Sequence, residues 1–381
     1  MPLSLLSLLV HAYVAWRLVP AMPGPAWVPA LLGAVLAVSA LVLPWGMMAR
    51  RVRHPTWSDA LAWAGLLFMG LFSSLLVLTV LRDVALLLAA GVQMLWPAGV
   101  RMAALRSQSA VVVPVVAGLV TLWGLFNARR RAAVVRVDVP IVGLPVSLHG
   151  FTIAQISDVH VGPTIKGPYL QAIVHAVNGL QADLVAVTGD LVDGSVRDLA
   201  PHVAPLAKLA SRHGTYFVTG NHEYYSGAHA WVAELRRLGI TVLMNEHVVL
   251  RHGPLALQAE LVLAGVADHG AHHFDPTHRS DPHAALAGAP ASAVVKILLA
   301  HQPRSAEAAA KAGFDLQLSG HTHGGQFWPW NLFVPLQQPF TAGLHRWQEL
   351  WVYTSRGTGY WGPPKRFGAP SEITHLRLVP A

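Results

Sequence analysis

The chain has 381 residues, of which 53% are hydrophobic and only 12% are charged, and its mean hydropathy is +0.44. This composition excludes an ordinary soluble enzyme and predicts membrane spans, in a chain long enough for two or three domains. The net charge of +8 lies within residues 1–131, which hold ten arginines and two aspartates, while residues 132–381 hold 17 basic and 17 acidic residues. We therefore assign the basic charge to a membrane region and expect no nucleic-acid partner. The absence of cysteine excludes disulfide bonds and thiolate metal sites.

Residues 1–131 are predicted to form about four transmembrane helices. A bilayer core of about 30 Å needs about 20 residues at about 1.5 Å each, and three uncharged apolar runs approach that length. The segment Leu3–Trp16, which is shorter and contains His11, is the fourth predicted span; a cleaved signal peptide is the alternative, although no basic segment precedes it. The segment Val84–Trp96 either extends the third helix or lies in the membrane interface. The three clear spans are Trp27–Leu43, Ala60–Val80 and Ala110–Phe126.

The arginines predict an orientation. Three arginines between residues 50 and 53 follow the second span, and Arg129–Arg131 follow the last. Four spans place both clusters on one side, which the positive-inside rule makes cytoplasmic. We therefore expect a multi-pass protein of the cell inner membrane, with the rest of the chain in the cytoplasm. Five spans would separate the clusters, and Arg101 and Arg106, which would lie outside, count against this orientation.

Two other interpretations of residues 1–131 are weaker. Buried helices of a soluble protein seldom have uncharged runs of such length. A transporter or channel is disfavoured because the three clear spans contain no charged residue that could line an ion pathway.

From residue 132 onward, short apolar runs alternate with helix-like segments, which predicts an α/β domain with buried sheets. Residues 132–149 are predicted to be a linker with a lead-in strand, and residues 150–381 the main domain. The expected helices are Tyr169–Leu180, Ala230–Leu238 and Ser305–Ala312. The expected strands are Val134–Val142, Thr152–Ile156, Leu184–Val187, Tyr216–Val218, Thr241–Met244, Leu261–Gly265, Val294–Leu299, Leu316–Leu318 and Leu350–Tyr353.

Five of these strands are followed directly by residues that bind metals. The motifs are Asp158-Val159-His160, Gly189-Asp190-Leu191-Val192-Asp193, Gly220-Asn221-His222-Glu223, Ala300-His301 and Gly320-His321-Thr322-His323-Gly324-Gly325-Gln326. Mixed oxygen and nitrogen donors suit Mn²⁺, Fe or Zn²⁺. Seven ligands are too many for one ion and predict two ions that share a carboxylate. The seven are Asp158, His160, Asp190, Asn221, His301, His321 and His323.

Each motif alone has a simpler interpretation. An isolated Asp-x-His or Gly-Asp pair is usually a turn, and a lone His301 is more often a core histidine. Glu223 is expected to hold a ligand in place or to begin a helix. Asp193 either caps a turn or orients a ligand. Arg356 either pairs with a substrate phosphate or forms a structural salt bridge.

Two segments near the motifs have no assigned role. Ala267–Ala291, rich in His, Asp and Pro, is expected to be a surface loop, near the site or apart from it. Phe327–Phe333, which contains Trp328 and Trp330, either packs on the core or forms an apolar lip for a bilayer or an acyl chain.

The motifs, in this order, resemble the calcineurin-like metallophosphoesterase superfamily. Gly324-Gly325-Gln326 and Tyr353–Gly357 are similar to its membrane-associated branch, the bacterial YkuE/YaeI-type phosphohydrolases. The resemblance covers about Gly150–Leu378 and leaves the membrane spans outside. It implies a four-layer α/β/β/α sandwich, in which two packed sheets are flanked by helices.

The resemblance also implies roles for the site residues. Two divalent metal ions are expected, with Mn²⁺ favoured and Fe, Zn²⁺ or Mg²⁺ as alternatives. A hydroxide that bridges the metals would be the nucleophile, and His222 would contact the phosphoryl oxygen and protonate the leaving group. Asp190 would bridge the ions. One ion would bind Asp158, His160 and His323, and the other Asn221, His301 and His321.

The expected function is that of a membrane-anchored phosphohydrolase. A site beside the bilayer favours a lipid-linked phosphoester or pyrophosphate, of which UDP-diacylglucosamine is one candidate. A phosphomonoesterase or a cyclic-nucleotide phosphodiesterase would need the same metals. The alternative from another class is a non-catalytic membrane sensor or scaffold that retains the fold, and the presence of His222 argues against it.

Overall fold

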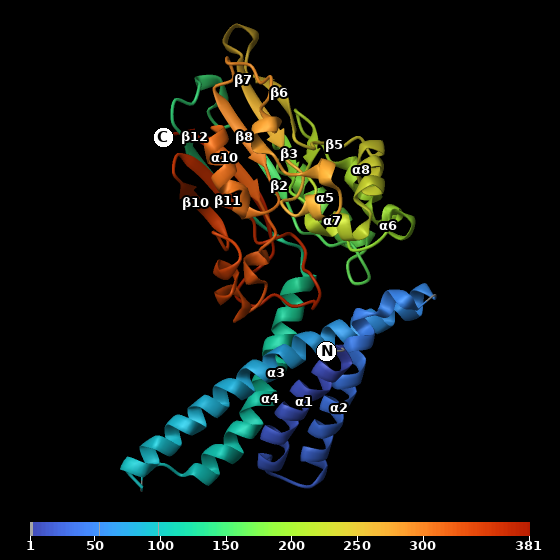
Figure 1. Cartoon of the computed structure of the whole chain (residues 1–381), viewed down its shortest axis with the longest axis vertical. Helices are drawn as coiled ribbons and strands as arrows, with labels where there is room; N and C mark the ends of the chain where they lie inside the picture. Colours follow the sequence, from blue (N-terminus) through green and yellow to red (C-terminus); the bar gives the residue numbers. More distant parts are fainter. Residues whose placement is uncertain (1–2, 53, 98) are drawn as a thin grey trace. The chain divides into compact units, whose positions relative to one another are not determined.

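The computed structural model describes residues 3–52, 54–97 and 99–381 (Figure 1). These residues form two compact units. One contains the chain up to Asn127 together with Gly362–Lys365, and the other contains Ala128–Trp361 and Arg366–Ala381. The segment 132–149, predicted as a linker and lead-in strand, lies in the second unit and contains strand β1.

The first unit is built from long apolar helices, as predicted. Each of the four is long and apolar enough to cross a membrane. The segment Val84–Trp96 extends the third helix, which continues to Leu95. Short 3₁₀ turns, η1 (Val19–Ala21) and η2 (Ala49–Arg51), follow the first two helices. The long helices are α1 (Leu3–Leu18), α2 (Trp27–Met47), α3 (Pro55–Leu95) and α4 (Met102–Arg129).

Helix α3 continues through Arg82 and Asp83, which follow the uncharged run Ala60–Val80. Both charged side chains have partners within this unit. The guanidinium of Arg17 donates to Asp83 over 2.8 Å, and the Tyr13 hydroxyl donates to the same carboxylate over 2.7 Å. Because the charges are paired, the helix can continue through them.

The surroundings of His11 explain how the apolar helix α1 accommodates a histidine. The ring is buried, with Nδ1 2.7 Å from the carbonyl oxygen of Ser7 and Nε2 2.8 Å from Oγ of Ser39. One face of the ring stacks on Phe72. Both ring nitrogens therefore have a partner, which removes most of the cost of burying them.

The second unit contains two six-stranded sheets. One has the order β1-β12-β2-β3-β4-β5 and the other the order β10-β11-β9-β8-β7-β6. All the expected strands are present, with ends that differ by at most two residues. The strands are β1 (Ala133–Ile141), β2 (Thr152–Ile156), β3 (Leu184–Val187), β4 (Thr215–Phe217), β5 (Thr241–Val242), β6 (Glu246–His252), β7 (Ala259–Gly265), β8 (Val295–Leu299), β9 (Leu316–Ser319), β10 (Gly343–Trp347), β11 (Leu350–Thr354) and β12 (Glu372–Pro380).

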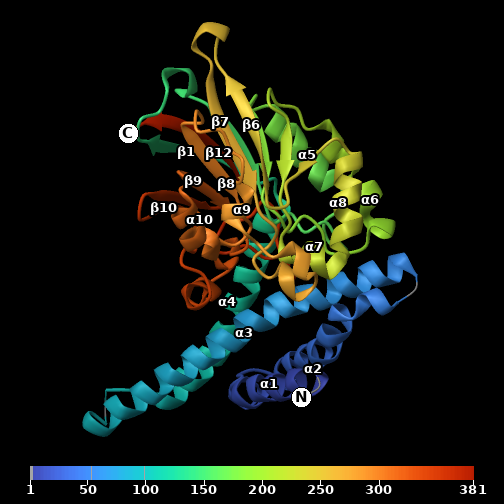
Figure 2. The same ribbon diagram turned by 45° about the horizontal axis from the view of Figure 1, so that its top comes forward.

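Helices cover the outer faces of both sheets. Figure 2 shows α5, α6 and α8 beside the first sheet, and α9 and α10 beside the second. The helices of this unit are α5 (Gly167–Asn178), α6 (Val196–Val203), α7 (Asn221–Ser226), α8 (Ala228–Arg237), α9 (Pro282–Ala285) and α10 (Ala306–Ala312). Further 3₁₀ turns are η3 (Val146–Leu148), η4 (Ala204–Lys208), η5 (Leu255–Leu257), η6 (Ala271–His273), η7 (Pro276–His278), η8 (Pro303–Ser305), η9 (His323–Gly325), η10 (Trp330–Leu332) and η11 (Val334–Leu336).

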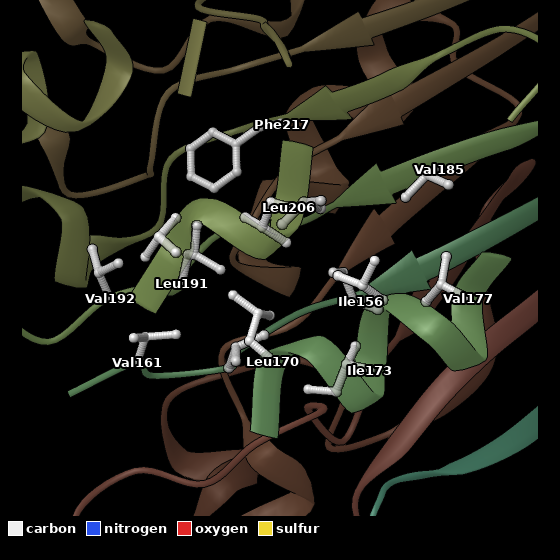
Figure 3. Close-up of a cluster of buried hydrophobic side chains, with 14 of the residues drawn as sticks. Ile156, Val161, Leu170, Ile173, Val177, Val185, Leu191, Val192, Leu206 and Phe217 are labelled. Carbon is white, nitrogen blue, oxygen red and sulfur yellow. The ribbon is translucent and has the colours of Figure 1, made fainter. Parts of the chain in front are cut away.

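Alternating side chains divide the core into layers. On β3, Leu184 and Ala186 point into the space between the sheets, where they meet residues of the second sheet such as Leu263. Val185 and Val187 point the opposite way into the cluster under α5 and α8, part of which Figure 3 shows. This period of two is the geometry of a strand buried on both faces. The second unit is therefore a four-layer α/β/β/α sandwich, as the resemblance implied.

The parallel pairs fix where the functional loops lie. Strands β2, β3 and β4 run parallel, as do β7, β8 and β9. Their carboxyl ends therefore lie at one edge of each sheet. The motif loops follow β2, β3, β4, β8 and β9, and the two sheets contribute them to the same place.

Two neighbouring histidines, His213 and His252, lead to a prediction of how stability depends on pH. Nε2 of His213 lies 3.1 Å from Nδ1 of His252, and both rings contact Phe151. Burial lowers the pKa of both rings; for His213 the neighbouring His252 and Arg212 lower it further, while Asp183 opposes the change in both. A lowered pKa means that the unfolded chain binds protons more readily, so stability falls as the pH drops below about 6.5.

We expect the double variant His213→Gln/His252→Gln to lose less thermal stability on acidification than the wild type. Thermal unfolding of the detergent-solubilised chain at pH 7.5 and 5.5 measures this, and the difference between the two pH values is the quantity compared. Each kcal/mol recovered corresponds to about 2–4 °C for a domain of this size. Equal acid-induced shifts in both proteins would show that this pair does not contribute.

Candidate metal centre

The first group of candidate ligands joins the loops after β2 and β9. Nε2 of His160 lies 3.0 Å from Nε2 of His323, and the latter lies 3.4 Å from Oδ1 of Asp158. All three residues are buried. Donor atoms about 3 Å apart are spaced like neighbouring ligands around one cation, because metal–ligand bonds of about 2.0–2.2 Å place them at that separation.

The second group joins the loops after β3, β4, β8 and β9. Nε2 of His301 lies 3.2 Å from Oδ2 of Asp190 and 3.3 Å from Nδ1 of His321. The amide oxygen of Asn221 lies 3.1 Å from the same His321 nitrogen. These four residues come from both sheets and converge on one point.

Asp190 lies between the two groups. Its Oδ2 is 3.2 Å from His301 in the second group and 3.9 Å from Nε2 of His160 in the first. Its other oxygen, Oδ1, accepts a hydrogen bond from the backbone N–H of His222 over 2.8 Å, which fixes the carboxylate. The structure therefore brings together all seven residues that the sequence nominated as ligands.

The loops that carry these residues have an unusual backbone. Nine non-glycine residues of the described chain have positive φ, and five of them are candidate ligands. Such conformations cost about 1–3 kcal/mol each and persist only where the surrounding structure enforces them. The five are Asp158 (φ 53°), His160 (55°), Asp190 (51°), His321 (70°) and His323 (53°).

The electrostatics of the cluster require a positive charge. Asp158 and Asp190 are both buried, and burial raises the pKa of Asp158, against the opposing effect of His301. Burial acts the same way on Asp190, but His301, His222 and His160 outweigh it and hold the pKa of Asp190 well below its usual range. In turn, Asp190 overcomes burial and holds the pKa of His301 well above its usual value. Asp190 and His301 therefore each favour the charged form of the other.

Other rings of the cluster stay neutral, which is the form that binds metals. Burial and the neighbouring His301 lower the pKa of His321 to about 3. Burial, His160 and the Arg366 guanidinium hold the pKa of His323 well below its usual range. Two buried carboxylates among neutral imidazoles fit divalent cations, since isolated charges are costly to bury without compensation.

Asp193 orients two of the histidines. Its Oδ1 lies 3.1 Å from Nδ1 of His160 and 2.6 Å from Nδ1 of His222. Of the two alternatives for this residue, the structure thus shows the orienting one. Both rings consequently present Nε2 toward Asp190, and His222 lies 3.9 Å from Oδ2 of that residue.

Glu223 holds the loop after β3 in place. It lies at the beginning of α7 and is fully buried, and its carboxylate accepts hydrogen bonds from the backbone N–H groups of Gly220 (2.6 Å), Leu191 (2.8 Å) and Asp190 (3.0 Å). Burial and the nearby Asp190 raise the pKa of Glu223 to about 8, and these N–H groups oppose that rise.

Sequence reasoning missed Arg366. This guanidinium is fully buried, and it lies 3.1 Å from Nδ1 of His323 while donating to the carbonyl oxygens of His323 and Arg356. Burial lowers the pKa of Arg366 to about 10. No motif signalled it, because an arginine after Pro-Pro-Lys resembles a surface residue.

Arg356 is already paired within the protein. Its Nε donates to Oε2 of Glu372 over 2.6 Å, which is the structural salt bridge that the sequence left open as an alternative. Its side chain remains 30% exposed. Contact with a substrate phosphate therefore stays a prediction.

Aromatic side chains surround His222. The rings of Tyr225 and Trp361 lie 5.2 and 5.6 Å from its ring, and both residues are more than half exposed. Trp361 is held by Gln326, whose amide oxygen accepts its backbone N–H over 2.8 Å. In the segment Phe327–Phe333, Phe327 is buried, whereas Trp328 and Trp330 are exposed.

The insert Ala267–Ala291 lies partly at the surface and partly beside the site. It contains η6, η7 and α9. Asp268 is buried and accepts a hydrogen bond from Gln302, the residue after His301, over 2.9 Å. The insert is therefore more ordered than the expected loop.

Comparison with known proteins identifies relatives. Residues 151–325 match the family described as "Calcineurin-like phosphoesterase". The chain is 42% identical over 288 residues to "Transmembrane protein with metallophosphoesterase domain" of Bos taurus, which covers 74% of this chain and 64% of that protein. A protein of the same name from Danio rerio is 39% identical over 276 residues, covering 71% and 63%.

A bacterial relative is matched over more of its length. "Uncharacterized metallophosphoesterase YkuE" of Bacillus subtilis is 30% identical over 248 residues, which cover 62% of this chain and 81% of that protein. The chain spans slightly less than two thirds of the two vertebrate relatives.

Gly220 provides a test of the geometry. A Cβ atom at this position would overlap the Asp190 carboxylate, so Gly220→Ala must displace it. We expect metal affinity to fall about 10–100-fold, as when residues that position ligands are changed. Bound metal per chain, measured after equilibrium dialysis against Mn²⁺, checks this. The matched control is Gly167→Ala, whose Cβ would approach its neighbours only to 3.6 Å; equal affinity in both variants would contradict the assignment.

Proposed function

We propose, from the premise that the chain belongs to the calcineurin-like phosphoesterase family, that it is a membrane-anchored phosphohydrolase with two divalent metal ions. The four helices able to cross a membrane support the anchoring. The arginines after the second and fourth helices support a cytoplasmic position for the second unit.

The spacing of the donors supports a division of the ligands between two ions. Asp190 is the shared ligand, because its Oδ2 faces donors of both groups. Mn²⁺ suits this mixture of oxygen and nitrogen donors, as do Fe and Zn²⁺, and Mg²⁺ is a further candidate. Asp158, His160 and His323 would hold one ion, and Asn221, His301 and His321 the other.

When bound, two such ions polarise a phosphoryl group and lower the pKa of a water molecule enough to make it a nucleophile. The chain itself supplies the proton for the leaving group. His222 is the residue for this task, because its ring lies at the edge of the cluster and is not needed as a ligand.

The pairing of His222 with Asp193 is the observation that carries this assignment. Burial would lower the pKa of His222, but the 2.6 Å contact with Asp193 and the nearby Asp190 raise it above its ordinary value. The raised pKa favours the protonated ring, which can donate from Nε2. A metal site with a purely structural role would not require an imidazole whose pKa is raised in this way.

The aromatic residues beside His222 support a substrate with an apolar part. The rings of Trp361 and Tyr225 lie beside that of His222, the proposed general acid, and both residues are more than half exposed. Trp and Tyr favour the boundary between lipid and water. We propose a lipid-linked phosphoester or pyrophosphate, of which UDP-diacylglucosamine is one candidate.

We expect His222→Ala to lose about 10²–10⁴-fold in kcat when the leaving group is an alkoxide, and much less when it is p-nitrophenolate. A poor leaving group needs the proton, whereas a good one departs without it. The test compares kcat for an alkyl and an aryl phosphodiester with Mn²⁺, using purified full-length protein.

Bound Mn²⁺ serves as the control in this experiment and should be unchanged in His222→Ala. Equal losses on both substrates would contradict the general-acid role. If the wild type were no more active than His222→Ala on both substrates, a non-catalytic scaffold would be favoured.

We expect Trp361→Ala to lower kcat/KM about tenfold for a lipid-linked pyrophosphate in mixed micelles, since a desolvated aromatic contact contributes about 1–2 kcal/mol. Activity on a short water-soluble phosphodiester should change less than twofold. Leu257→Ala, which truncates a side chain with 70% exposure in η5, is the control. A parallel loss on both substrates would show that Trp361 supports the site without selecting lipid.

A further inference from the structure

A group of metal-binding side chains lies outside the centre described above. It consists of His229 on α8 with Asp275 and His278 at η7 of the insert Ala267–Ala291. None of the three belongs to a sequence motif of the metal centre. We propose that they form a separate Zn²⁺ site, which fastens the insert to helices α7 and α8.

The geometry supports a shared ion. Nε2 of His229 lies 3.0 Å from Oδ2 of Asp275, and Nε2 of His278 lies 3.9 Å from the same oxygen. The two rings have centroids 4.9 Å apart, and the three donor atoms all lie within 4.8 Å of one another. Neighbouring ligands of a tetrahedral Zn²⁺ with bonds of about 2.0–2.1 Å lie about 3.3 Å apart, so small side-chain rotations suffice.

The remaining atoms of two ligands are held by other groups. Oδ1 of Asp275 accepts hydrogen bonds from the backbone N–H (2.9 Å) and the hydroxyl (2.7 Å) of Thr277, so Oδ2, which faces both histidine rings, is the oxygen that would bind a cation. Nδ1 of His278 lies 2.9 Å from the Tyr224 hydroxyl. If Nδ1 donates to that oxygen, the lone pair of Nε2 points to the site, an arrangement common among zinc-binding histidines.

The type of donor identifies the ion. Two imidazoles and one carboxylate suit Zn²⁺ better than Ca²⁺ or Mg²⁺, which prefer oxygen ligands. The side chain of His229 is 75% exposed, while those of Asp275 and His278 are about one-fifth exposed. A fourth position can therefore be occupied by water.

The site is connected to the wall around His222. Phe274, the residue before Asp275, packs against Tyr224 at 5.7 Å and against Tyr225 at 5.6 Å. Tyr225 in turn contacts the ring of His222. An ion at this site would therefore immobilise both the insert and the aromatic residues beside the proposed general acid.

The alternative is a metal-free hydrogen bond between His229 and Asp275. At a surface position such a bond contributes little to stability, and His278 would not take part in it. The two interpretations differ in the number of Zn²⁺ ions that the chain binds.

The experiment measures Zn²⁺ in the full-length, detergent-solubilised protein by elemental analysis after equilibrium dialysis at micromolar Zn²⁺. We expect His229→Ala to bind one ion fewer per chain than the wild type. The matched control is His283→Ala, which removes another exposed histidine of the same insert and should lose none. Equal zinc content in wild type and His229→Ala would overturn the proposal.

A second readout follows the insert directly. Zn²⁺ should slow cleavage within residues 267–291 by a protease several-fold in the wild type and in Asp190→Asn, but not in His229→Ala. The Asp190→Asn protein separates this site from the dinuclear centre, because its loss of zinc should leave the protection intact. Zinc protection that persists in His229→Ala would equally overturn the proposal.

Discussion

The arrangement of the second unit depends on two buried carboxylates that need a cation. Asp158 and Asp190 follow two neighbouring strands of the first sheet, β2 and β3, and both side chains are buried. Within the protein, His301, His222 and His160 are the groups that favour the charged form of Asp190. Isolated charges of this kind cost several kcal/mol to bury. The apolar strands thus bury two acidic side chains next to each other, and divalent cations suit such a position.

Glycine residues let the backbone of the motif loops pass close to the candidate ligands. Gly220 and Gly320 lack the side-chain atoms that would collide with Asp190 and Asp158, respectively. Gly189 has positive φ and lies where a Cβ atom would be 2.8 Å from Nδ1 of His301. Five of the candidate ligands themselves have positive φ angles, which are strained for residues other than glycine. Rigid, parallel strands on both sides hold these conformations, so the loops can carry strain that an isolated peptide would relax.

The ligand motifs were predictable because each follows a short apolar strand buried on both faces, a pattern with few alternatives. The strands that the sequence analysis did not predict lack that pattern. Strand β12 includes Arg377, whose side chain is 54% exposed and pairs with Asp138 on a solvent-facing side of the sheet. The missed strands β6 and β10 are edge strands with polar residues. Arg366 was not predicted because backbone carbonyl groups, which carry no side-chain signal in the sequence, accept its hydrogen bonds and make its burial tolerable.

Helix α7 connects the chemical parts of the molecule. Within six residues it carries Asn221 and His222, while its Glu223 binds the backbone of the loop that positions Asp190. Tyr224 and Tyr225 extend from the same turn toward the insert. A helix this short has little stability of its own, so it depends on tertiary contacts at both ends. Glu223 anchors one side and the insert supports the other, and the position of His222 therefore depends on how firmly the insert is held.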